Sequence, residues 1–246
     1  MKTLLMCDAL VGSAIAEWLL LNYPADLGAI VTTSENDTSR AARKKNVPTF
    51  VFESEEQLTE DLSGLAAFDI GLLAWWPKLV SPSILALSNG GFLNTHPSLL
   101  PHNRGKHYNF WALVEQVPFG VSLHFVDAGI DSGDIVAQRV IPYGWEDTGE
   151  TLYGKAARAM IELFKSAYPD IRSGQISRTP QDLTQGSLHY AKDINPASVI
   201  DLDQTYTARA LLNLLRARTF AGHPACSFEE DGQVYEVRVN IERKST

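Results

Sequence analysis

Short apolar runs, separated by amphipathic or polar stretches, constrain the fold of this chain more than any other feature. Residues 4–7, 29–33, 70–75 and 91–94 are such runs, and the amphipathic stretch 12–21 follows the first of them. Strands buried on both faces read as continuous apolar runs, and a parallel sheet needs helical crossovers between its strands. The alternation therefore predicts an α/β fold, with a mainly parallel sheet and helices on both of its faces.

The middle of the chain predicts a hairpin and a long helix. Residues 121–126 alternate as a half-buried strand does, and residues 135–140 follow after a glycine-rich turn. We expect these two strands to pair with each other. Thr148 then begins a helix that continues to about residue 168.

The character of the sequence changes toward the C-terminus, and we divide the chain near residue 185. Residues 179–196 are polar and rich in turn formers, which is typical of a linker or an extended surface segment. A predicted helix over 205–218 follows. Beyond it, Asp231-Gly232 lies between two apolar stretches and predicts a second hairpin.

We therefore expect two parts, an α/β domain over residues 1–185 and a small appendage of helix and β-hairpin over residues 186–246. An isolated two-stranded hairpin is only marginally stable in water. The appendage offers few residues to cover the apolar face of its own hairpin. We expect it to pack against a second subunit, which makes the protein a homodimer.

The composition excludes several classes of partner. The formal net charge is −8, whereas binding a nucleic acid through its phosphates normally needs a basic face. Residues 79–101 carry no Asp, Glu, Lys or Arg, but their prolines and polar side chains interrupt any membrane-spanning helix. Cys7 and Cys226 fit neither a disulfide framework nor a metal-ligand pattern. We expect a cytoplasmic protein with free thiols, no bound metal, and neither a nucleic acid nor a membrane as partner.

The predicted strand, turn and helix at the N-terminus are Rossmann-like but lack the features of dinucleotide binding. The fingerprint GxGxxG would stand at this first turn. Residues 7–13 contain a single glycine, Gly12, and Asp8 puts a carboxylate where a pyrophosphate would bind. A phosphate-cradling P-loop is also absent from the sequence. The sequence thus argues against an NAD enzyme and against P-loop phosphoryl transfer.

The most informative segment reads Asn-Thr-His-Pro-Ser-Leu-Leu-Pro at 94–101, directly after a predicted strand. In open α/β sheets, binding sites form at the carboxyl ends of strands. Alternation along the chain puts Asn94 and His96 on the same side. A lone histidine is more often structural. An amide and an imidazole that face one point can stabilise an oxyanion and move one proton.

This segment, together with Gly-Ile-Asp-Ser-Gly-Asp-Ile at 129–135, resembles the signature of folate-dependent formyltransferases. That family includes glycinamide ribonucleotide transformylases, methionyl-tRNA formyltransferases and sugar-nucleotide N-formyltransferases. The resemblance is strong over roughly residues 70–142 and loose over the first strand and helix. It implies transfer of a formyl group from 10-formyltetrahydrofolate, the co-substrate, to an amine.

By this resemblance, Asn94, His96 and Asp131 match the catalytic residues of the family. Attack of an amine on the formyl carbon gives a tetrahedral intermediate with a negative oxygen, to which Asn94 and protonated His96 would donate. Losing one such donor typically costs about 10²–10³ in rate. Asp131 would orient His96 or a water molecule and favour the imidazolium. Whether His96 or an ordered water carries the amine proton stays open.

The resemblance also implies a pocket for the pterin ring of the folate. Its two walls would be formed by Leu73, Lys78, Leu79, Val80, Leu85 and Phe92 on one side, and by Ala128, Gly129, Ile130 and Asp131 on the other. Ordinary core packing is the alternative for each apolar member. Trp75 and Trp76 are adjacent, and neighbouring side chains of a strand point to opposite faces, so we expect one of them to line a cleft.

The residues that follow the signature indicate the acceptor. Pro-His-Asn-Arg-Gly at 101–105 and His-Tyr-Asn-Phe-Trp-Ala at 107–112 resemble the continuation in sugar-nucleotide N-formyltransferases. The resemblance implies a nucleotide-linked amino sugar of the dTDP-4-amino-4,6-dideoxyhexose class, formylated for a surface polysaccharide. Residues 207–246 are too short and too nearly neutral for an RNA-binding module. The base, the hexose and the position of its amine stay open.

A nucleotide diphosphate needs cationic or amide donors, and its base needs an aromatic surface. The candidates for these contacts are Lys78, Arg104, Tyr108, Asn109 and Phe220. A structural salt bridge is the alternative for Arg104. Arg216 and Arg218, on the predicted C-terminal helix, are expected to lie on its solvated polar face.

Other functions would use the same residues. The acceptor can be a different amine. With water in place of the amine, the trio of Asn94, His96 and Asp131 would hydrolyse 10-formyltetrahydrofolate, although such hydrolases carry an additional N-terminal domain. A folate or nucleotide-sugar sensor without catalysis is the alternative from another class, and the intact trio argues against it.

Overall fold

The computed structural model describes residues 1–244. The strands of its main sheet are β1 (Thr3–Cys7), β2 (Leu27–Thr32), β3 (Thr49–Val51), β4 (Ile70–Ala74), β5 (Phe92–His96), β7 (Gly120–Phe125) and β8 (Ile135–Val140). Two smaller pairs are β6 (Arg104–Gly105) with β9 (Leu188–His189), and β10 (Cys226–Glu230) with β11 (Gln233–Val237). The helices are α1 (Ala9–Asn22), α2 (Asp37–Lys44), α3 (Glu55–Ser63), α4 (Pro82–Leu85), α5 (Tyr108–Glu115), α6 (Gly149–Ser173), α7 (Ile194–Ala197) and α8 (Ala208–Arg218), with 3₁₀ turns at Pro24–Asp26, Leu183–Gln185 and Ala191–Asp193.

The main sheet runs in the order β3-β2-β1-β4-β5-β7-β8. The strands from β3 to β5 are parallel to one another, and β7 runs antiparallel to both of its neighbours, β5 and β8. The predicted mainly parallel α/β sheet is thereby confirmed, as is the predicted pairing of the strands near 121–126 and 135–140. The strand order reverses between β1 and β4, which is where open α/β sheets form their crevices.

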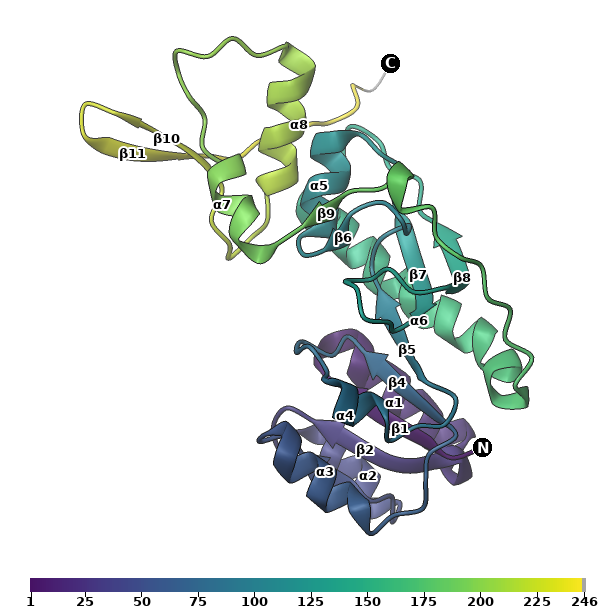
Figure 1. The fold of residues 1–246 in the computed structure, drawn as a ribbon. Helices are drawn as coiled ribbons and strands as arrows, with labels where there is room; N and C mark the ends of the chain where they lie inside the picture. The colour runs from purple at the N-terminus through teal and green to yellow at the C-terminus, as the bar shows by residue number, and fades with distance from the viewer. Residues whose placement is uncertain (245–246) are drawn as a thin grey trace.

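Side chains of β1 alternate between two apolar layers, one on each face of the sheet. Leu5 and Cys7 join the layer under α1, α5 and α6, whereas Leu4 and Met6 join the layer under α3 and α4. All of these side chains are buried. Burying an aliphatic side chain of this size contributes about 1.5–3 kcal/mol. The two layers therefore fix the sheet and, with it, the strand ends that carry polar residues (Figure 1).

The first helix begins earlier than the sequence analysis predicted. α1 starts at Ala9 rather than near Gly12, because the Asp8 carboxylate accepts a hydrogen bond from the Ala9 N–H (2.7 Å) and caps the helix. Thr33 donates a second hydrogen bond to the same carboxylate. The carboxylate of Asp8 therefore provides a negative charge at the N-terminus of α1.

The segment predicted as a linker or extended surface segment, residues 179–196, follows the α/β domain closely over its first part. Thr179 forms a β-bridge with Ile135 of β8, and β9 pairs in parallel with β6. Of the two predicted forms, this part is the extended surface segment rather than a free linker, because backbone hydrogen bonds to distant strands hold it in place. The division of the chain near residue 185 stays a prediction.

Beyond β9 the chain forms α7, α8 and the hairpin β10–β11, which projects from the body at the end opposite to β2 and α3 (Figure 1). Asp231 and Gly232 have φ angles of 50° and 70°, as a tight hairpin turn requires. The predicted appendage of helix and β-hairpin is confirmed. Within residues 1–244, no helix combines the length and the apolar character that crossing a bilayer needs.

Candidate active site

Asn94 and His96 lie two residues apart on β5, so their side chains leave the strand on the same face. Asp131 reaches them from the loop between β7 and β8. Its Oδ1 accepts a hydrogen bond from Asn94 Nδ2 (3.3 Å), and its Oδ2 lies 3.3 Å from His96 Nδ1. The structure thus brings together the three side chains that the sequence analysis selected as catalytic.

The Asp131 carboxylate is fixed by its own backbone and by a neighbouring strand. Its φ angle is 49°, in the left-handed region that residues other than glycine rarely adopt. On β6, the Gly105 N–H donates a hydrogen bond to Asp131 Oδ2 (2.9 Å). That oxygen therefore lies between a backbone donor and the His96 ring, which leaves the carboxylate little freedom to turn away.

His124 is a further member of this cluster, which the sequence analysis missed. It pairs with Asn94 across β7 and β5 and is 2% exposed, and its Nε2 lies 3.2 Å from Asn94 Nδ2 and 3.5 Å from Asp131 Oδ1. Its Nδ1 lies 2.8 Å from the carbonyl oxygen of Phe125, which can only accept, so Nδ1 carries a proton. The one sequence feature that could have indicated His124 is its position on the strand that leads into the loop of Asp131.

Burial lowers the pKa of His96 below its usual value, and the Asp131 carboxylate opposes this effect. Burial by itself would raise the pKa of Asp131, but the interactions with His96, His124 and the Gly105 N–H hold that pKa well below its usual range. At neutral pH the site therefore holds a carboxylate beside a neutral imidazole. When His96 accepts a proton, Asp131 stabilises the resulting imidazolium.

This arrangement suits the addition of an amine to an acyl carbon. His96 can take up a proton beside a carboxylate that stabilises its charged form. Asn94 Nδ2 lies 3.2 Å from His124 Nε2 and 3.3 Å from Asp131 Oδ1, near the long end of the hydrogen-bond range. A fully charged oxyanion binds a donor more strongly than these long contacts do, so it can compete for one of them.

Part of the predicted pterin pocket is core. Leu73 and Phe92 are 6% and 0% exposed in the layer under α3 and α4, and Val80 and Leu85 pack partly against the same layer. The Phe92 ring fills the space over Gly71, where a Cβ would lie 2.2 Å from it. The side chain of Phe92 thus offers no surface to a ligand and instead holds β5 against β4.

The other predicted pocket residues lie in loops at the strand ends. Leu79 is 87% exposed, and Lys78 Nζ lies 4.7 Å from the centre of the Phe52 ring. The loop before Asp131 has two exposed residues and one half-buried residue, Ala128, Gly129 and Ile130. Because β4 and β5 are neighbours in the sheet, the loop after β4 begins beside the strand that carries Asn94 and His96.

The two adjacent tryptophans fill opposite layers of the sheet, as expected. Trp75 packs on Tyr153 of α6 (ring centroids 5.2 Å apart), and Trp76 packs on Phe52 (5.4 Å). Neither indole Nε1 has a hydrogen-bond partner within the described residues. A cleft lined by one of the two rings stays a prediction.

The two aromatic residues selected for the substrate differ in their contacts. Tyr108, the first residue of α5, has its ring 5.9 Å from that of His96, measured between centroids. Phe220 follows α8 and packs on Tyr153 of α6 with ring centroids 5.6 Å apart. Tyr108 is therefore next to the trio, whereas Phe220 contacts α6.

The polar residues selected for the substrate differ in how they are used. Asn109 Nδ2 donates to the carbonyl oxygen of Gly149 (2.8 Å), so this amide joins α5 to the start of α6. Arg104, beside Gly105 on β6, is half-buried, and its Nε has no hydrogen-bond partner within residues 1–244. A structural salt bridge of Arg104 is not among the ion pairs of that range. The Nε of Arg104 is thus a buried donor without a partner in the described part of the chain.

The structure contradicts the prediction that Arg216 lies on a solvated face of its helix. Arg216 is 4% exposed, and its guanidinium donates to the carbonyl oxygens of Gly144 (2.5 Å) and Asp147 (3.1 Å) and to Asn213 Oδ1 (2.9 Å). The helix α8 packs against the loop that precedes α6, so the face that bears Arg216 is internal.

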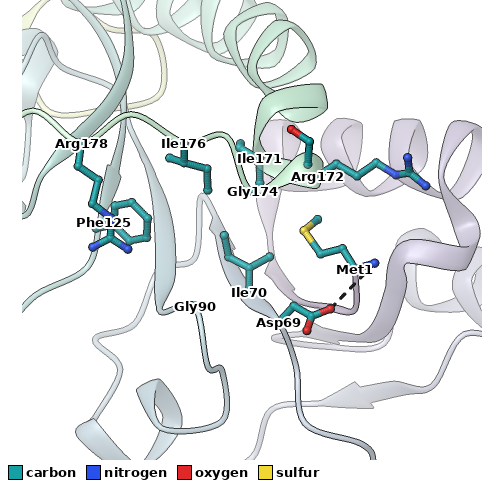
Figure 2. A pocket seen from close by; sticks show the side chains of 11 residues that line it. Met1, Asp69, Ile70, Gly90, Phe125, Ile171, Arg172, Gly174, Ile176 and Arg178 are labelled. Carbon is teal, nitrogen blue, oxygen red and sulfur yellow. Dashed lines mark ion pairs between the residues drawn. The ribbon is translucent and has the colours of Figure 1, made fainter.

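A hollow of about 480 Å³ lies away from the trio, beside the first residue of β4 (Figure 2). Ile70, the first residue of β4, and Phe125, the last residue of β7, are in its wall, with Arg178 over the Phe125 ring. The trio lies toward the last residues of β5, so this hollow is not part of the site. Within residues 1–244, no group of His, Cys, Asp or Glu side chains is arranged to hold a metal ion.

An α/β sheet with a carboxylate, an imidazole and an amide converging at one strand end defines a class of enzymes, those that add a nucleophile to a small acyl group. This chain belongs to the formyl transferase family, whose model matches residues 20–167. A second model, the N-formyltransferase dimerization C-terminal domain, matches residues 193–243. The resemblance drawn from the signature motifs is thereby confirmed.

Several known proteins are similar to this chain. Methionyl-tRNA formyltransferase from Listeria monocytogenes is 29% identical over 206 residues, and the match covers 78% of this chain and 64% of that protein. A sugar N-formyltransferase from Shewanella sp. has a TM-score of 0.81 and 18% identity over 100% of this chain and 99% of that one. The N-formyltransferase from Helicobacter canadensis, solved with folinic acid and dTDP-3-aminofucose, has a TM-score of 0.74 and 21% identity over 94% of this chain and 85% of that one. At these identities the structural likeness establishes the fold.

Proposed function

We propose that this chain transfers a formyl group from 10-formyltetrahydrofolate to the amine of a nucleotide-linked amino sugar. The observation that carries the proposal is the convergence of Asn94, His96 and Asp131 beside β5 in a chain of the formyl transferase family. 10-Formyltetrahydrofolate is the co-substrate, and the chemistry requires no metal.

The reaction begins when the amine attacks the formyl carbon and the carbonyl opens to an oxyanion. Asn94 donates a hydrogen bond to this oxygen, and His96 takes the proton that the new C–N bond releases. Asp131 stabilises the imidazolium. The intermediate then collapses, the bond between the formyl carbon and N10 of the folate breaks, and His96 returns the proton to that nitrogen. The products are a formamide and tetrahydrofolate.

We assign the folate to the space between the loop after β4 and the loop before Asp131. Lys78, Leu79 and Val80 would contact it from the first loop, with Leu73 and Leu85 beneath. The second loop, with Ala128 and Gly129 exposed and Ile130 half-buried, would contact the polar edge of the pterin ring through its backbone. This position puts the formyl group beside the trio.

A group of cations supports a substrate that carries a diphosphate. Burial lowers the pKa of His107, and so do the charges of Arg218, Lys106 and His223, because all of them lie in one region where α5 packs on α8. Arg104 precedes this region on β6, is half-buried, and makes no ion pair within the described residues. A diphosphate would neutralise these cations, with Tyr108 or Phe220 available to stack on the base. Asn109 is already used within the fold.

Two likenesses support the choice of a sugar nucleotide over a tRNA. Residues 193–243 match the N-formyltransferase dimerization C-terminal domain, and the similar solved structures include sugar N-formyltransferases, one of them solved with dTDP-3-aminofucose. By these likenesses we propose a substrate of the dTDP-4-amino-4,6-dideoxyhexose class. The product would enter a surface polysaccharide such as a lipopolysaccharide O-antigen, and the reaction would take place in the cytoplasm.

We further propose that residues 1–185 form the catalytic domain and that residues 186–246 provide the contact of a homodimer. The match of residues 193–243 to a dimerization domain supports this division. The hairpin β10–β11 also leaves Val234 and Tyr235 exposed, at 69% and 49%.

A panel assay tests the proposed reaction. The purified protein is mixed with 10-formyltetrahydrofolate and several nucleotide-linked amino sugars, and both tetrahydrofolate release and the mass of each sugar are followed. We expect one sugar to gain a formyl group, with a rate about 10²–10³ lower in Asn94→Ala because an oxyanion donor is lost. Equal release of tetrahydrofolate without any sugar would contradict transfer and indicate hydrolysis. Folate binding without turnover on any amine would indicate a sensor.

A further inference from the structure

A polar segment far from the trio in sequence holds the loop that carries Asp131. This segment, residues 181–189, is named the strap, and it lies along the α/β domain on the way from α6 to α7 (Figure 1). Its first residue, Gln181, donates from Nε2 to the carbonyl oxygens of Asp131 (3.0 Å) and Gly133 (2.7 Å). One side-chain amide thus ties two backbone positions of the catalytic loop.

The other end of the strap holds the strand that binds the carboxylate. Ser187 O accepts a hydrogen bond from Arg104 N (3.0 Å), and His189 O accepts one from Lys106 N (2.9 Å). Gly105, between these two donors, is the residue whose N–H binds Asp131 Oδ2. A Cβ on Gly105 would lie 2.1 Å from His189 O, so only glycine permits this close approach.

Glu115, at the end of α5, joins the strap to the backbone beside His96. Its Oε1 lies 2.6 Å from His189 Nε2, and its Oε2 accepts hydrogen bonds from Ser187 Oγ (2.8 Å) and Asn103 Nδ2 (2.8 Å). Asn103 is 1% exposed, and its carbonyl oxygen lies 3.4 Å from His96 Nε2. The carboxylate of Glu115 therefore fixes the backbone on the far side of the His96 ring from Asp131.

The backbone at both of these positions needs such support. Asp131 and Asn103 have φ angles of 49° and 52°, a conformation that is strained for residues other than glycine and that persists only where the surroundings impose it. The strap contains few apolar side chains, so its specific hydrogen bonds rather than core burial determine its position. These bonds converge on the residues that hold the Asp131–His96 pair.

We propose that the strap positions the Asp131–His96 pair for catalysis, with Gln181 and Glu115 as positioning residues, an inference that rests on the proposed formyl transfer. Neither side chain is required to touch a substrate. Each fixes a backbone segment, and these segments fix the carboxylate and the imidazole relative to each other.

Gln181→Ala tests the first contact, with Gln185→Ala as its matched control. Gln185 is an exposed glutamine of the same strap, and its Nε2 donates only within the strap, to Asp182 Oδ2 (2.8 Å). We expect kcat to fall by up to about 10² in Gln181→Ala, because a small displacement of a reacting group has an effect of this size. The KM for 10-formyltetrahydrofolate should stay close to that of the unmodified chain. Gln185→Ala should leave both values unchanged.

The titration of His96 provides a readout that does not depend on turnover. The charged or titratable groups that act on its ring are Asp131, His124 and Lys106, and of these only Asp131 raises its pKa. A displaced carboxylate should therefore lower the pKa of His96 further. The pKa is measured by NMR of the imidazole carbons, with the His96 signal identified by its loss in His96→Asn. We expect a downward shift in Gln181→Ala and Glu115→Ala and none in Gln185→Ala.

Glu115→Gln keeps an acceptor for Ser187 and Asn103, so it should retain most of the activity that Glu115→Ala loses. Unchanged kcat and unchanged His96 titration in Gln181→Ala would overturn the proposal. A lowered unfolding temperature with reduced turnover but an unshifted titration would also overturn it, because the strap would then only stabilise the fold. If the unmodified chain transferred no formyl group, only the proposed function would be contradicted. The His96 titration does not depend on turnover and would still test the role of the strap.

Discussion

The charge of His96 connects catalysis to stability. Burial holds the folded pKa of this imidazole below its ordinary value of 6.5, despite the neighbouring Asp131. A neutral ring is what the proposed reaction needs at its start, because the first task of His96 is to accept a proton. The same burial lowers the stability of the folded chain in acid, since protonation of His96 places a positive charge in a buried site.

We predict that the free energy of unfolding decreases as the pH falls below about 6.5, and that His96→Asn weakens this dependence. In that range the unfolded chain binds a proton at His96 that the folded chain does not, so acid favours unfolding. Asp131, whose pKa is lowered, loses its stabilising contribution only in stronger acid. Urea unfolding at about pH 7.5 and about pH 5 measures the difference. An equal loss of stability in both proteins would contradict the prediction. His107, whose pKa burial also lowers, should leave part of the dependence in the variant.

Asn94, His96 and Asp131 could be selected from the sequence because they stand in short motifs with a recognisable spacing. Their convergence is a property of the strand pairing: β5 carries two of them, and the loop from β7 brings the third. His124 has no such motif, since a histidine in an alternating strand reads as an ordinary half-buried residue. Only the register of β5 with β7, which pairs Asn94 with His124, reveals its role.

The helices and strands could be predicted where burial imposes a regular pattern of apolar residues. They could not be predicted where contacts with residues distant in sequence determine the conformation. The buried strands read as apolar runs, and the hairpin of β10 and β11 is marked by its Asp-Gly turn. α6 continues to Ser173, five residues beyond its predicted end and through Pro169, because Tyr168 and Ile171 are buried in the core on both sides of the proline. The polar sequence of the strap fits a linker or an extended surface segment, because polarity indicates exposure and cannot indicate pairing with β6.

The junction of α8 with the α/β domain depends on Arg216. We predict that Arg216→Ala lowers the free energy of unfolding by about 1–3 kcal/mol, because the buried carbonyl oxygens of Gly144 and Asp147 lose their donor. Arg209→Ala is the matched control, since Arg209 is exposed and stacks on the same Trp145 ring as Arg216 does. The guanidinium of Arg209 lies 5.2 Å from the centre of that ring, and that of Arg216 lies 4.9 Å from it. Chemical denaturation measures both variants. Similar effects of the two substitutions would show that the stacking, rather than the internal hydrogen bonds, holds α8.

The site draws on parts of the chain that are distant in sequence. Asn94 and His96 belong to β5, and Asp131 belongs to the loop after β7, which the strap holds in place. The helix α8 places Arg218 in the region of Lys106 and His107. The appendage is therefore connected to the proposed substrate region through α8 as well as to a proposed partner through its hairpin. If the hairpin is the dimer contact, the cation group lies on the element that leads into that contact, and dimerization should hold α8 against α5.

The hairpin β10–β11 offers the clearest test of assembly. Val234 is 69% exposed on β11, on the opposite face of the hairpin from the stack of Tyr235 on Phe228, whose ring centroids are 5.2 Å apart. A two-stranded hairpin with exposed apolar side chains gains stability when a second copy covers it. We predict that Val234→Asp converts a homodimer into a monomer of 27.1 kDa, because the partner would have to bury a carboxylate.

Gln233→Asp is the matched control for Val234→Asp. It adds the same charge one residue earlier on β11, where the side chain points to the other face of the hairpin. Light scattering of the unmodified chain and of both variants measures the mass. We expect the unmodified chain and Gln233→Asp to remain dimers. A monomeric unmodified chain would exclude the homodimer itself, whereas a dimer that persists in Val234→Asp would move the contact to another surface. Loss of the dimer in Val234→Asp alone would locate the contact on the Val234 face, and the panel assay on that monomer would then show whether α8 needs the partner to stay in place.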